Sequence, residues 1–199
     1  MKIVLIGDSH CRDLDAALSL MFPSFRIFTI TVGAQINDII ASYISSIPAI
    51  TTMNPAYIII HMGHNNIVYH SKYNPTPDET PKSIAEQTIT FANEVSSHHP
   101  TSKIYVSTIF PRTHTRTSTI SPHDVVMYNK KAKRHGQRIQ TLAQRAGLNH
   151  FMNNSMWLKI SISLEDSSQF RGDGLHLSKE GAKKIIIEWL TILKIIDSA

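Results

Sequence analysis

Hydrophobic residues occur along the chain in short runs, separated by longer amphipathic stretches. Four runs rich in β-branched residues have the length of buried strands and cover residues 2–6, 26–31, 56–61 and 103–107. The stretches between them have helical periodicity. Strands that alternate with helices predict βαβ units around a parallel sheet, and a short fifth strand is expected near residues 148–152.

Two helix starts are marked by residue pairs that favour a helix N-terminus. Thr80 precedes Pro81, and Ser121 precedes Pro122, so in each case a capping hydroxyl is followed by proline at the first helical position. Asp124 completes an S-x-x-D box after Ser121. We therefore expect helices to begin at both prolines.

The end of the chain predicts one further helix within residues 178–196. Apolar residues recur there at helical spacing and form one face: Ala182, Ile185, Ile186, Trp189, Leu190 and Leu193. Such a face is expected to dock on the sheet. The overall expectation is a three-layer α/β/α sandwich in one domain covering residues 1–199.

Composition is that of a globular protein, because 42% of the 199 residues are hydrophobic and 18% are charged. The single cysteine, Cys11, cannot form an internal disulfide. The short apolar run at the N-terminus leads into Gly7 rather than a cleavage site, and no stretch approaches a membrane span. These features favour a soluble, cytoplasmic protein.

Polar residues suited to catalysis follow the first three predicted strands. Ser9, after strand one, sits at a strand-to-helix turn where a helix N-terminus favours developing negative charge. Gly33 follows strand two and allows close approach to a backbone N–H, although a turn glycine has the same signature. Asn65 follows strand three, where its amide suits an oxyanion or merely a polar turn.

Near the C-terminus, Asp173 precedes His176 by three residues, close enough for the carboxylate to orient the imidazole. Each of these fragments is common by itself. Together they occur in a fixed order, and three of them follow predicted strands at the edge where open parallel sheets bind ligands. Chance is a poor explanation for that combination.

From Gly7 to His176 the chain resembles the SGNH (GDSL-like) hydrolases, whose four blocks supply Ser, Gly, Asn and His. The resemblance implies a flavodoxin-like strand order 2-1-3-4-5 and a serine esterase that needs no cofactor. Ser9 would be the nucleophile, and His176, oriented by Asp173, its base. The oxyanion hole would consist of the Ser9 and Gly33 N–H groups and the Asn65 side chain.

Two residues depart from the common pattern of this family. His10 stands where the GDSL motif has leucine, and Asn66 stands where the third block usually has aspartate. Neither change removes a catalytic group. Because an amide lacks the charge of a carboxylate, we expect Asn66 to cost a structural hydrogen bond to a neighbouring loop and to reduce activity without abolishing it.

Within the family, the short chain is similar to platelet-activating-factor acetylhydrolase-type esterases, which implies small acyl groups. Gly7-Asp8-Ser9-His10 and Gly63-His64-Asn65-Asn66 are also similar to esterase domains in first-open-reading-frame proteins of LINE retrotransposons. That narrower resemblance implies a longer natural protein, with RNA binding and self-association contributed by other segments.

Several further residues are candidates for the substrate pocket, because they lie near the catalytic edge or in the long loops that leave it: His10, His64, Tyr69 and Arg112. Histidine pairs at 61 and 64 and at 98 and 99 match no zinc motif, so no metal is expected.

A basic stretch within the helix predicted over residues 122–146 contains Lys130, Lys131, Lys133, Arg134, Arg138 and Arg145. It is either a solvated helix face or a contact for RNA or an anionic lipid surface. The alternative to an esterase is a catalytically weak or idle module that holds an acyl ligand or associates with nucleic acid.

Overall fold

Five parallel strands form one sheet in the order β2-β1-β3-β4-β5. The computed structural model describes residues 1–31, 35–67, 80–113, 121–145, 151–152 and 167–195. The strands are β1 (Lys2–Gly7), β2 (Arg26–Thr31), β3 (Tyr57–His61), β4 (Lys103–Ser107) and β5 (Phe151–Met152). The predicted fold class and strand order are therefore confirmed. Of the expected fifth strand, residues 148–150 lie outside the described residues.

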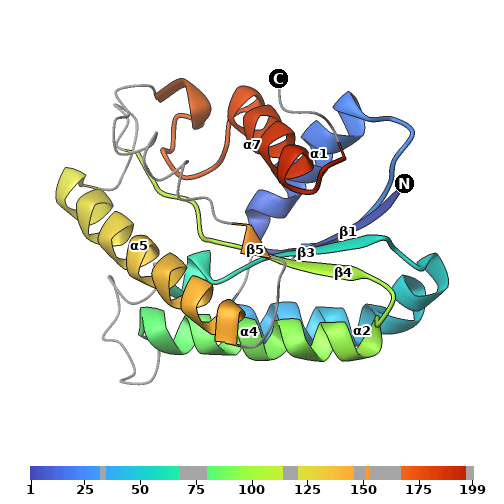
Figure 1. The fold of residues 1–199 in the computed structure, drawn as a ribbon. Coiled ribbons are helices and arrows are strands. Elements are labelled where there is room, and N and C mark those ends of the chain that lie inside the picture. Colours follow the sequence, from blue (N-terminus) through green and yellow to red (C-terminus); the bar gives the residue numbers. More distant parts are fainter. Residues whose placement is uncertain (32–34, 68–79, 114–120, 146–150, 153–166, 196–199) are drawn as a thin grey trace.

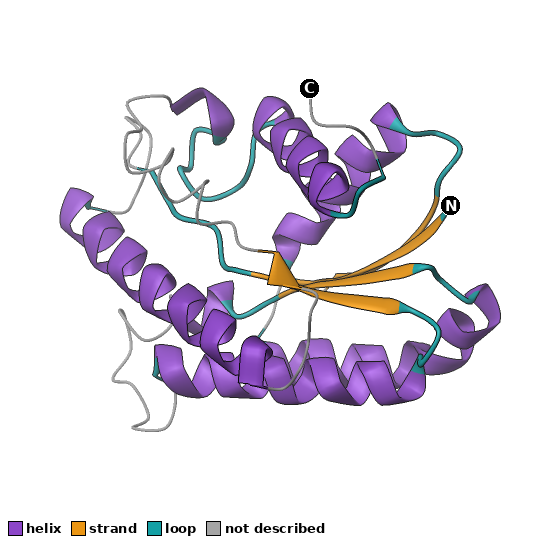
Figure 2. Ribbon diagram, in the orientation of Figure 1, coloured by secondary structure: helices purple, strands orange, loops and turns teal. Residues whose placement is uncertain are grey.

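Helices cover both faces of the sheet, which is seen nearly edge-on between two helical layers in Figures 1 and 2. One layer contains α1 (Ser9–Met21) and α7 (Lys179–Ile192); the other contains α2 (Ile36–Met53), α4 (Pro81–His98) and α5 (Pro122–Arg145). A short 3-10 helix, η1 (Ser167–Gln169), precedes α7. None of the helices described here is long and apolar enough to cross a membrane.

The strands read as continuous apolar runs because both of their faces are buried. In β1, Val4 and Ile6 pack into the core under α2, α4 and α5, whereas Ile3 and Leu5 pack into the core under α1 and α7. A sheet covered on both sides needs apolar residues at every position, which is why the run lacks alternation. Trp189 of α7 is the largest fully buried side chain of the core under α1 and α7.

The two helix starts predicted from Ser/Thr-Pro pairs are confirmed. The Thr80 hydroxyl accepts a hydrogen bond from the Ser83 N–H, and the Ser121 hydroxyl accepts one from the Asp124 N–H. Each bond satisfies one of the backbone donors that a helix N-terminus leaves without an intrahelical acceptor.

The C-terminal helix lies within the predicted residues 178–196. Ser178 caps it by accepting from the Gly181 N–H, and the helix ends at Ile192. Lys194 has a φ of 55°, and the Ile195 N–H donates back to the Leu190 carbonyl at 2.9 Å. This left-handed closure ends the helix although the apolar residues continue.

Strands β1 and β3 approach each other closely where β1 ends. Gly7 is in register with His61, and the Asp8 N–H donates to the His61 carbonyl at 3.2 Å. A Cβ on Gly7 would collide with that carbonyl oxygen and with the Cys11 sulfur. Only glycine therefore allows β1 to turn into α1 at this point without separating the strands.

Gly7→Ala is expected to destabilise the protein by about 1–3 kcal/mol or more, because the collision is with backbone that cannot move aside cheaply. Gly136→Ala is the matched control: the nearest atom is the Thr108 methyl group at 3.3 Å. There, the gain in helix propensity of about 0.5–1 kcal/mol offsets a small displacement. Urea unfolding measures both, and equal losses would contradict the role given to Gly7.

Candidate active site

The predicted catalytic residues gather at the carboxyl edge of the sheet, beside the central strands. Asp8 caps α1 directly after β1, Ser9 is the first residue of α1, and residues 62–67 follow β3. Strands β1 and β3 are neighbours in the sheet, and the strand order reverses between them. Open α/β sheets bind ligands at such a topological switch point. The loop between η1 and α7 approaches the same place.

Ser9, His176 and Asp173 form a chain of hydrogen bonds. The Ser9 hydroxyl lies 3.1 Å from Nε2 of His176, and Nδ1 of His176 lies 2.8 Å from Oδ2 of Asp173. A carboxylate only accepts, so Nδ1 donates to Asp173, and an unprotonated Nε2 can accept from the serine hydroxyl. The geometry is that of a nucleophile, a base and the group that orients the base.

Asp173 is held in its ionised form by the turn that it occupies. Its Oδ1 accepts from the Leu175 and His176 N–H groups at 2.8 and 2.9 Å. Partial burial works against the charge, but the hydrogen bonds from His176 and from the two backbone amides outweigh it and lower the pKa of Asp173. The carboxylate therefore remains an acceptor for the imidazole.

The loop that carries His176 is closed by backbone contacts. The Arg171 N–H donates to the His176 carbonyl at 2.8 Å, and Phe170 forms an isolated antiparallel bridge with Leu177. Gly174 supplies a φ of 67° within this turn. Arg171 also pairs with Asp13 of α1. These contacts fix the loop relative to α1 and hence relative to Ser9.

His64 and Arg112, both predicted pocket residues, form a buried network with Tyr128. An Arg112 guanidinium N–H donates to Nε2 of His64 at 2.9 Å, and the Tyr128 hydroxyl lies 2.7 Å from Nδ1 of the same ring. Because Nε2 accepts, the ring proton must be on Nδ1. The Nδ1–H group therefore donates to the Tyr128 hydroxyl. That hydroxyl in turn donates to the Phe110 carbonyl at 3.1 Å.

Electrostatics agree with this neutral tautomer of His64. Burial, followed by the positive charge of His10, places the pKa of His64 well below its ordinary value of 6.5. The Arg112 guanidinium also stacks over the Tyr128 ring, 4.4 Å from its centroid. Asn129 fixes the Arg112 backbone by bonding both its N–H and its carbonyl.

Three other predicted site residues differ in how far the structure describes them. Asn65 lies half-buried in the helical turn over residues 64–67, directly beyond β3. Gly33 and Tyr69 lie outside the described residues. Their parts in an oxyanion hole or a substrate pocket stay predictions.

Asn66 keeps a structural hydrogen bond, contrary to expectation. Its Oδ1 accepts from the Ile36 N–H, at the first residue of α2, with a separation of 3.1 Å, and the side chain is buried. An amide oxygen accepts a backbone N–H as a carboxylate oxygen does. Asn66 therefore connects this turn to α2 although it stands in place of the usual aspartate.

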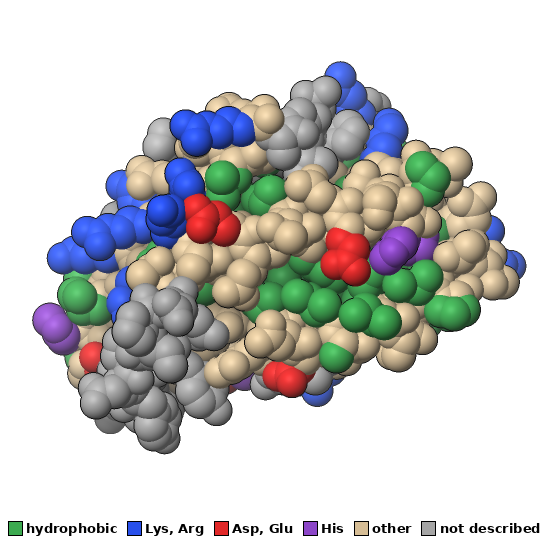
Figure 3. Space-filling model, turned by 90° about the horizontal axis from the view of Figure 1, so that it is seen from below, with side chains coloured by type: hydrophobic (Ala, Val, Ile, Leu, Met, Phe, Trp, Pro, Cys, Tyr) green, Lys and Arg blue, Asp and Glu red, His purple; other side chains and the backbone are tan. Residues whose placement is uncertain are grey.

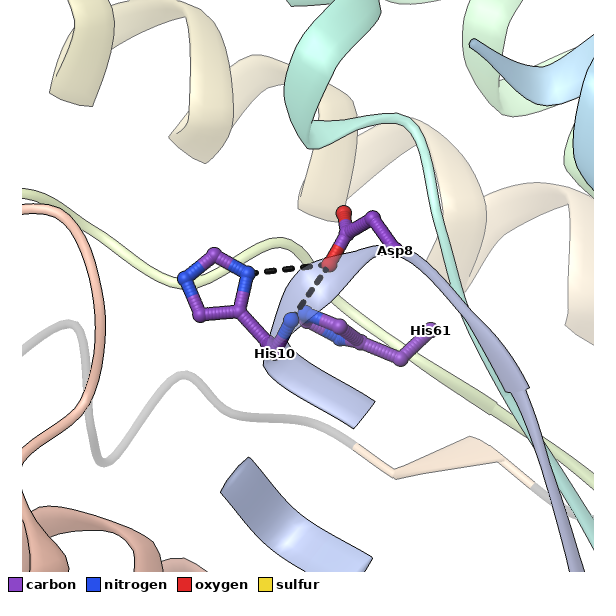
Figure 4. A group of neighbouring side chains, drawn as sticks. All are labelled: Asp8, His10 and His61. Carbon is purple, nitrogen blue, oxygen red and sulfur yellow. Dashed lines mark hydrogen bonds and ion pairs between the residues drawn. The ribbon is translucent and has the colours of Figure 1, made fainter. Parts of the chain in front are cut away.

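Asp8, His10 and His61 form a compact buried group that sequence spacing did not indicate (Figure 4). One possible ligand atom from each lies within 4.8 Å of the others. Both ring nitrogens of His10 are already hydrogen-bonded, to Asp8 and to the Leu175 carbonyl, so the group fits a metal ion poorly. The contact depends on β1–β3 register, which the sequence alone does not provide.

The basic stretch on α5 is largely exposed. Lys130, Lys133, Arg134 and Arg145 are open to solvent, whereas Arg138 pairs with Glu86 of α4 at 2.7 Å. Figure 3 shows lysine and arginine side chains gathered towards the end of the molecule where α5 lies. Contact with RNA or an anionic surface remains a prediction.

Comparison with known proteins identifies the fold. No family model matches the chain, and no curated protein matches its sequence. Solved structures do match: a protein described as a GDSL-like lipase from Parabacteroides merdae has a TM-score of 0.72 at 12% identity, covering 98% of this chain and 96% of its own. A lipase/acylhydrolase from Enterococcus faecalis has a TM-score of 0.68 at 16% identity, covering 97% and 95%.

A catalytic mutant of Axe2, an acetylxylan esterase from Geobacillus stearothermophilus, matches with a TM-score of 0.65 at 14% identity, covering 95% of this chain and 92% of its own. These matches span nearly the whole of each chain. The protein therefore has the fold of the GDSL-like, SGNH-type hydrolases.

Tyr128→Phe is expected to destabilise the protein by about 1–3 kcal/mol, because it removes the acceptor of the buried His64 Nδ1–H and one donor to the Phe110 carbonyl. Tyr57→Phe is the control, since the described residues offer its hydroxyl no hydrogen bond. Denaturant unfolding compares the two variants. Equal effects would show that the His64 network contributes nothing to stability.

Proposed function

We propose that this protein is a serine esterase of the SGNH (GDSL-like) type that hydrolyses short-chain carboxylic esters. The observation that carries the proposal is the hydrogen-bonded series from Ser9 through His176 to Asp173 at the carboxyl edge of the sheet. The similarity of the fold to that of esterases and lipases supports it. None of its steps needs a cofactor.

In the first step, the Ser9 hydroxyl oxygen attacks the ester carbonyl carbon while Nε2 of His176 takes the hydroxyl proton. The tetrahedral intermediate collapses when that proton passes to the leaving alcohol, and the acyl group remains on Ser9. Water then attacks the acyl-enzyme with His176 again as base, which releases the carboxylic acid and restores the serine. Asp173 stabilises the imidazolium in both halves.

The negative oxygen of each tetrahedral intermediate needs donors that are already oriented. Ser9 begins α1, so its N–H is among the helix donors without an intrahelical acceptor, and the helix dipole favours an anion there. By the family resemblance, the Gly33 N–H and the Asn65 amide complete the oxyanion hole. Removal of one such donor typically slows an enzyme about 10²- to 10³-fold.

Acetyl-type esters are the substrates that we propose. The structural neighbours include acetylxylan esterases as well as lipases, and the sequence is similar to acetylhydrolase-type esterases. A catalytically weak or idle module that holds an acyl ligand, or the nucleic-acid-associated module of a retrotransposon protein, is the alternative. Both keep the fold but predict no dependence of hydrolysis on Ser9.

Ser9→Ala is expected to lower the rate of p-nitrophenyl acetate hydrolysis at least about 10³-fold, because it removes the nucleophile of the triad. Ser19→Ala, which alters an exposed serine of the same helix, is expected to leave the rate unchanged. Butyrate and octanoate esters, assayed in parallel, measure the size of the acyl pocket, with acetate expected to react fastest.

The esterase proposal would be contradicted if the wild-type protein hydrolysed none of the three esters, or if it hydrolysed them no faster than Ser9→Ala does. The idle-module alternative would then be favoured. Circular dichroism of each variant establishes that a loss of rate is not a loss of fold.

A further inference from the structure

His10 connects the turn that carries Ser9 to the loop that carries His176. Its Nδ1 lies 2.9 Å from Oδ1 of Asp8, and its Nε2 lies 3.1 Å from the Leu175 carbonyl oxygen. The ring is completely buried. Leu175 immediately precedes His176, so a side chain in the first turn of α1 holds the backbone next to the proposed base.

The partners of His10 determine its protonation state. A backbone carbonyl can only accept a hydrogen bond, and so can an ionised carboxylate. Both ring nitrogens must therefore donate, which makes His10 an imidazolium paired with the Asp8 carboxylate. Asp8 Oδ1 also accepts from the His10 backbone N–H at 3.1 Å, which adds a second donor that favours its ionised form (Figure 4).

The electrostatic surroundings of His10 agree with this deduction. Burial acts against both charges, but the charge and the hydrogen bond of Asp8 outweigh it and raise the pKa of His10 above 6.5. In the same way, His10 lowers the pKa of Asp8 despite burial of that carboxylate. A buried ion pair of this kind is stable only while both partners are present.

Among the described residues, the other buried histidines that face His10 are neutral, and one further carboxylate favours its charge. Asp13 of α1 adds a favourable negative charge. His61 and His64 have ring centroids 5.6 and 4.6 Å from that of His10, and burial lowers the pKa of both, that of His61 to about 4. His176 lies on the loop side, with its ring centroid 5.8 Å away.

We propose that His10 is a positioning residue: as a buried imidazolium held by Asp8, it fixes the Leu175 carbonyl and thereby holds Nε2 of His176 in line with the Ser9 hydroxyl. The inference rests on the proposed esterase function. Leucine, the usual residue at this position of the GDSL motif, has no donor for either partner. The histidine therefore adds a polar connection between α1 and the loop that the motif does not otherwise contain.

The protonation state of His10 is tested directly by NMR of the histidine ring nitrogens in the wild-type protein. At pH 7.5 an ordinary histidine is mostly neutral. We expect one histidine to keep protons on both ring nitrogens at this pH, and we expect its signal to be absent in His10→Leu. A His10 spectrum with one unprotonated nitrogen at pH 7.5 would overturn the inference.

The positioning role is tested by steady-state kinetics on p-nitrophenyl acetate. His10→Leu should lower kcat roughly 10- to 100-fold, because a displacement of about 1 Å at the reacting groups has an effect of that size, while KM changes by less than about threefold. His123→Gln, at an exposed histidine of α5, is the control and should leave both constants unchanged.

Because His10→Leu leaves the Asp8 carboxylate buried without its partner, the double variant Asp8→Asn/His10→Leu is measured beside it. It removes both charges, and asparagine can still cap α1. A folded double variant should show the same fall in kcat. A double variant with kcat within about twofold of wild type would refute the positioning role.

Different results would refute the esterase function and the role proposed for His10. Absence of ester hydrolysis together with a doubly protonated His10 would refute the esterase function and leave the buried ion pair standing. Hydrolysis that depends on Ser9, together with a neutral His10, would refute the inference drawn from His10 alone.

Discussion

The site depends on the hydrogen bonds and the negative charge of the buried Asp8 carboxylate. It accepts from the His10 backbone N–H and thereby caps α1, and it also pairs with the His10 ring. The first contact aims the N-terminus of α1, and Ser9 with it, at the carboxyl edge of the sheet. The second makes His10 a cation whose remaining N–H reaches the Leu175 carbonyl. One buried charge thus connects the turn of the proposed nucleophile with the loop of the proposed base.

A single buried carboxylate can stabilise few positive charges, and this explains the different states of the histidines beneath the site. The charge and the hydrogen bond of Asp8 outweigh burial and raise the pKa of His10. Burial lowers the pKa of His61 to about 4 and that of His135 to about 3. His64 is neutral for a further reason, since it accepts from Arg112 at Nε2. Without a carboxylate hydrogen-bonded to the ring, burial favours the neutral form in each case.

The sequence predicted the layers and the helix starts because these depend on local patterns. Apolar runs buried on both faces gave the four main strands, and the Thr80 and Ser121 caps gave the beginnings of α4 and α5. Strand order was available only through the family resemblance, since pairing between distant strands leaves no local signature. The sequence placed the C-terminal helix only within residues 178–196, and its end at Ile192 could not be predicted because Lys194 reverses the backbone where the apolar pattern continues.

The proximity of Ser9, His176 and Asp173 could be expected from the sequence because each occurs in a short motif with a fixed chain order, and the structure joins them by hydrogen bonds. The Asp8–His10–Leu175 connection could not, because it joins residues 165 positions apart and requires the ring to point inward. His10 was expected to face the substrate pocket, and the structure places it fully buried with both nitrogens bonded. The position of His61 beside Asp8 could not be predicted either, because it depends on the register between β1 and β3.

The central claim is that Ser9 is a nucleophile activated by His176, and covalent labelling tests it most directly. A fluorophosphonate reacts with a serine hydroxyl only when a neighbouring base activates it. Peptide mass spectrometry should find the label on Ser9, with no labelling of Ser9→Ala and labelling of His176→Ala slowed at least about 100-fold. Label on another residue, or equal rates for wild type and His176→Ala, would contradict the claim.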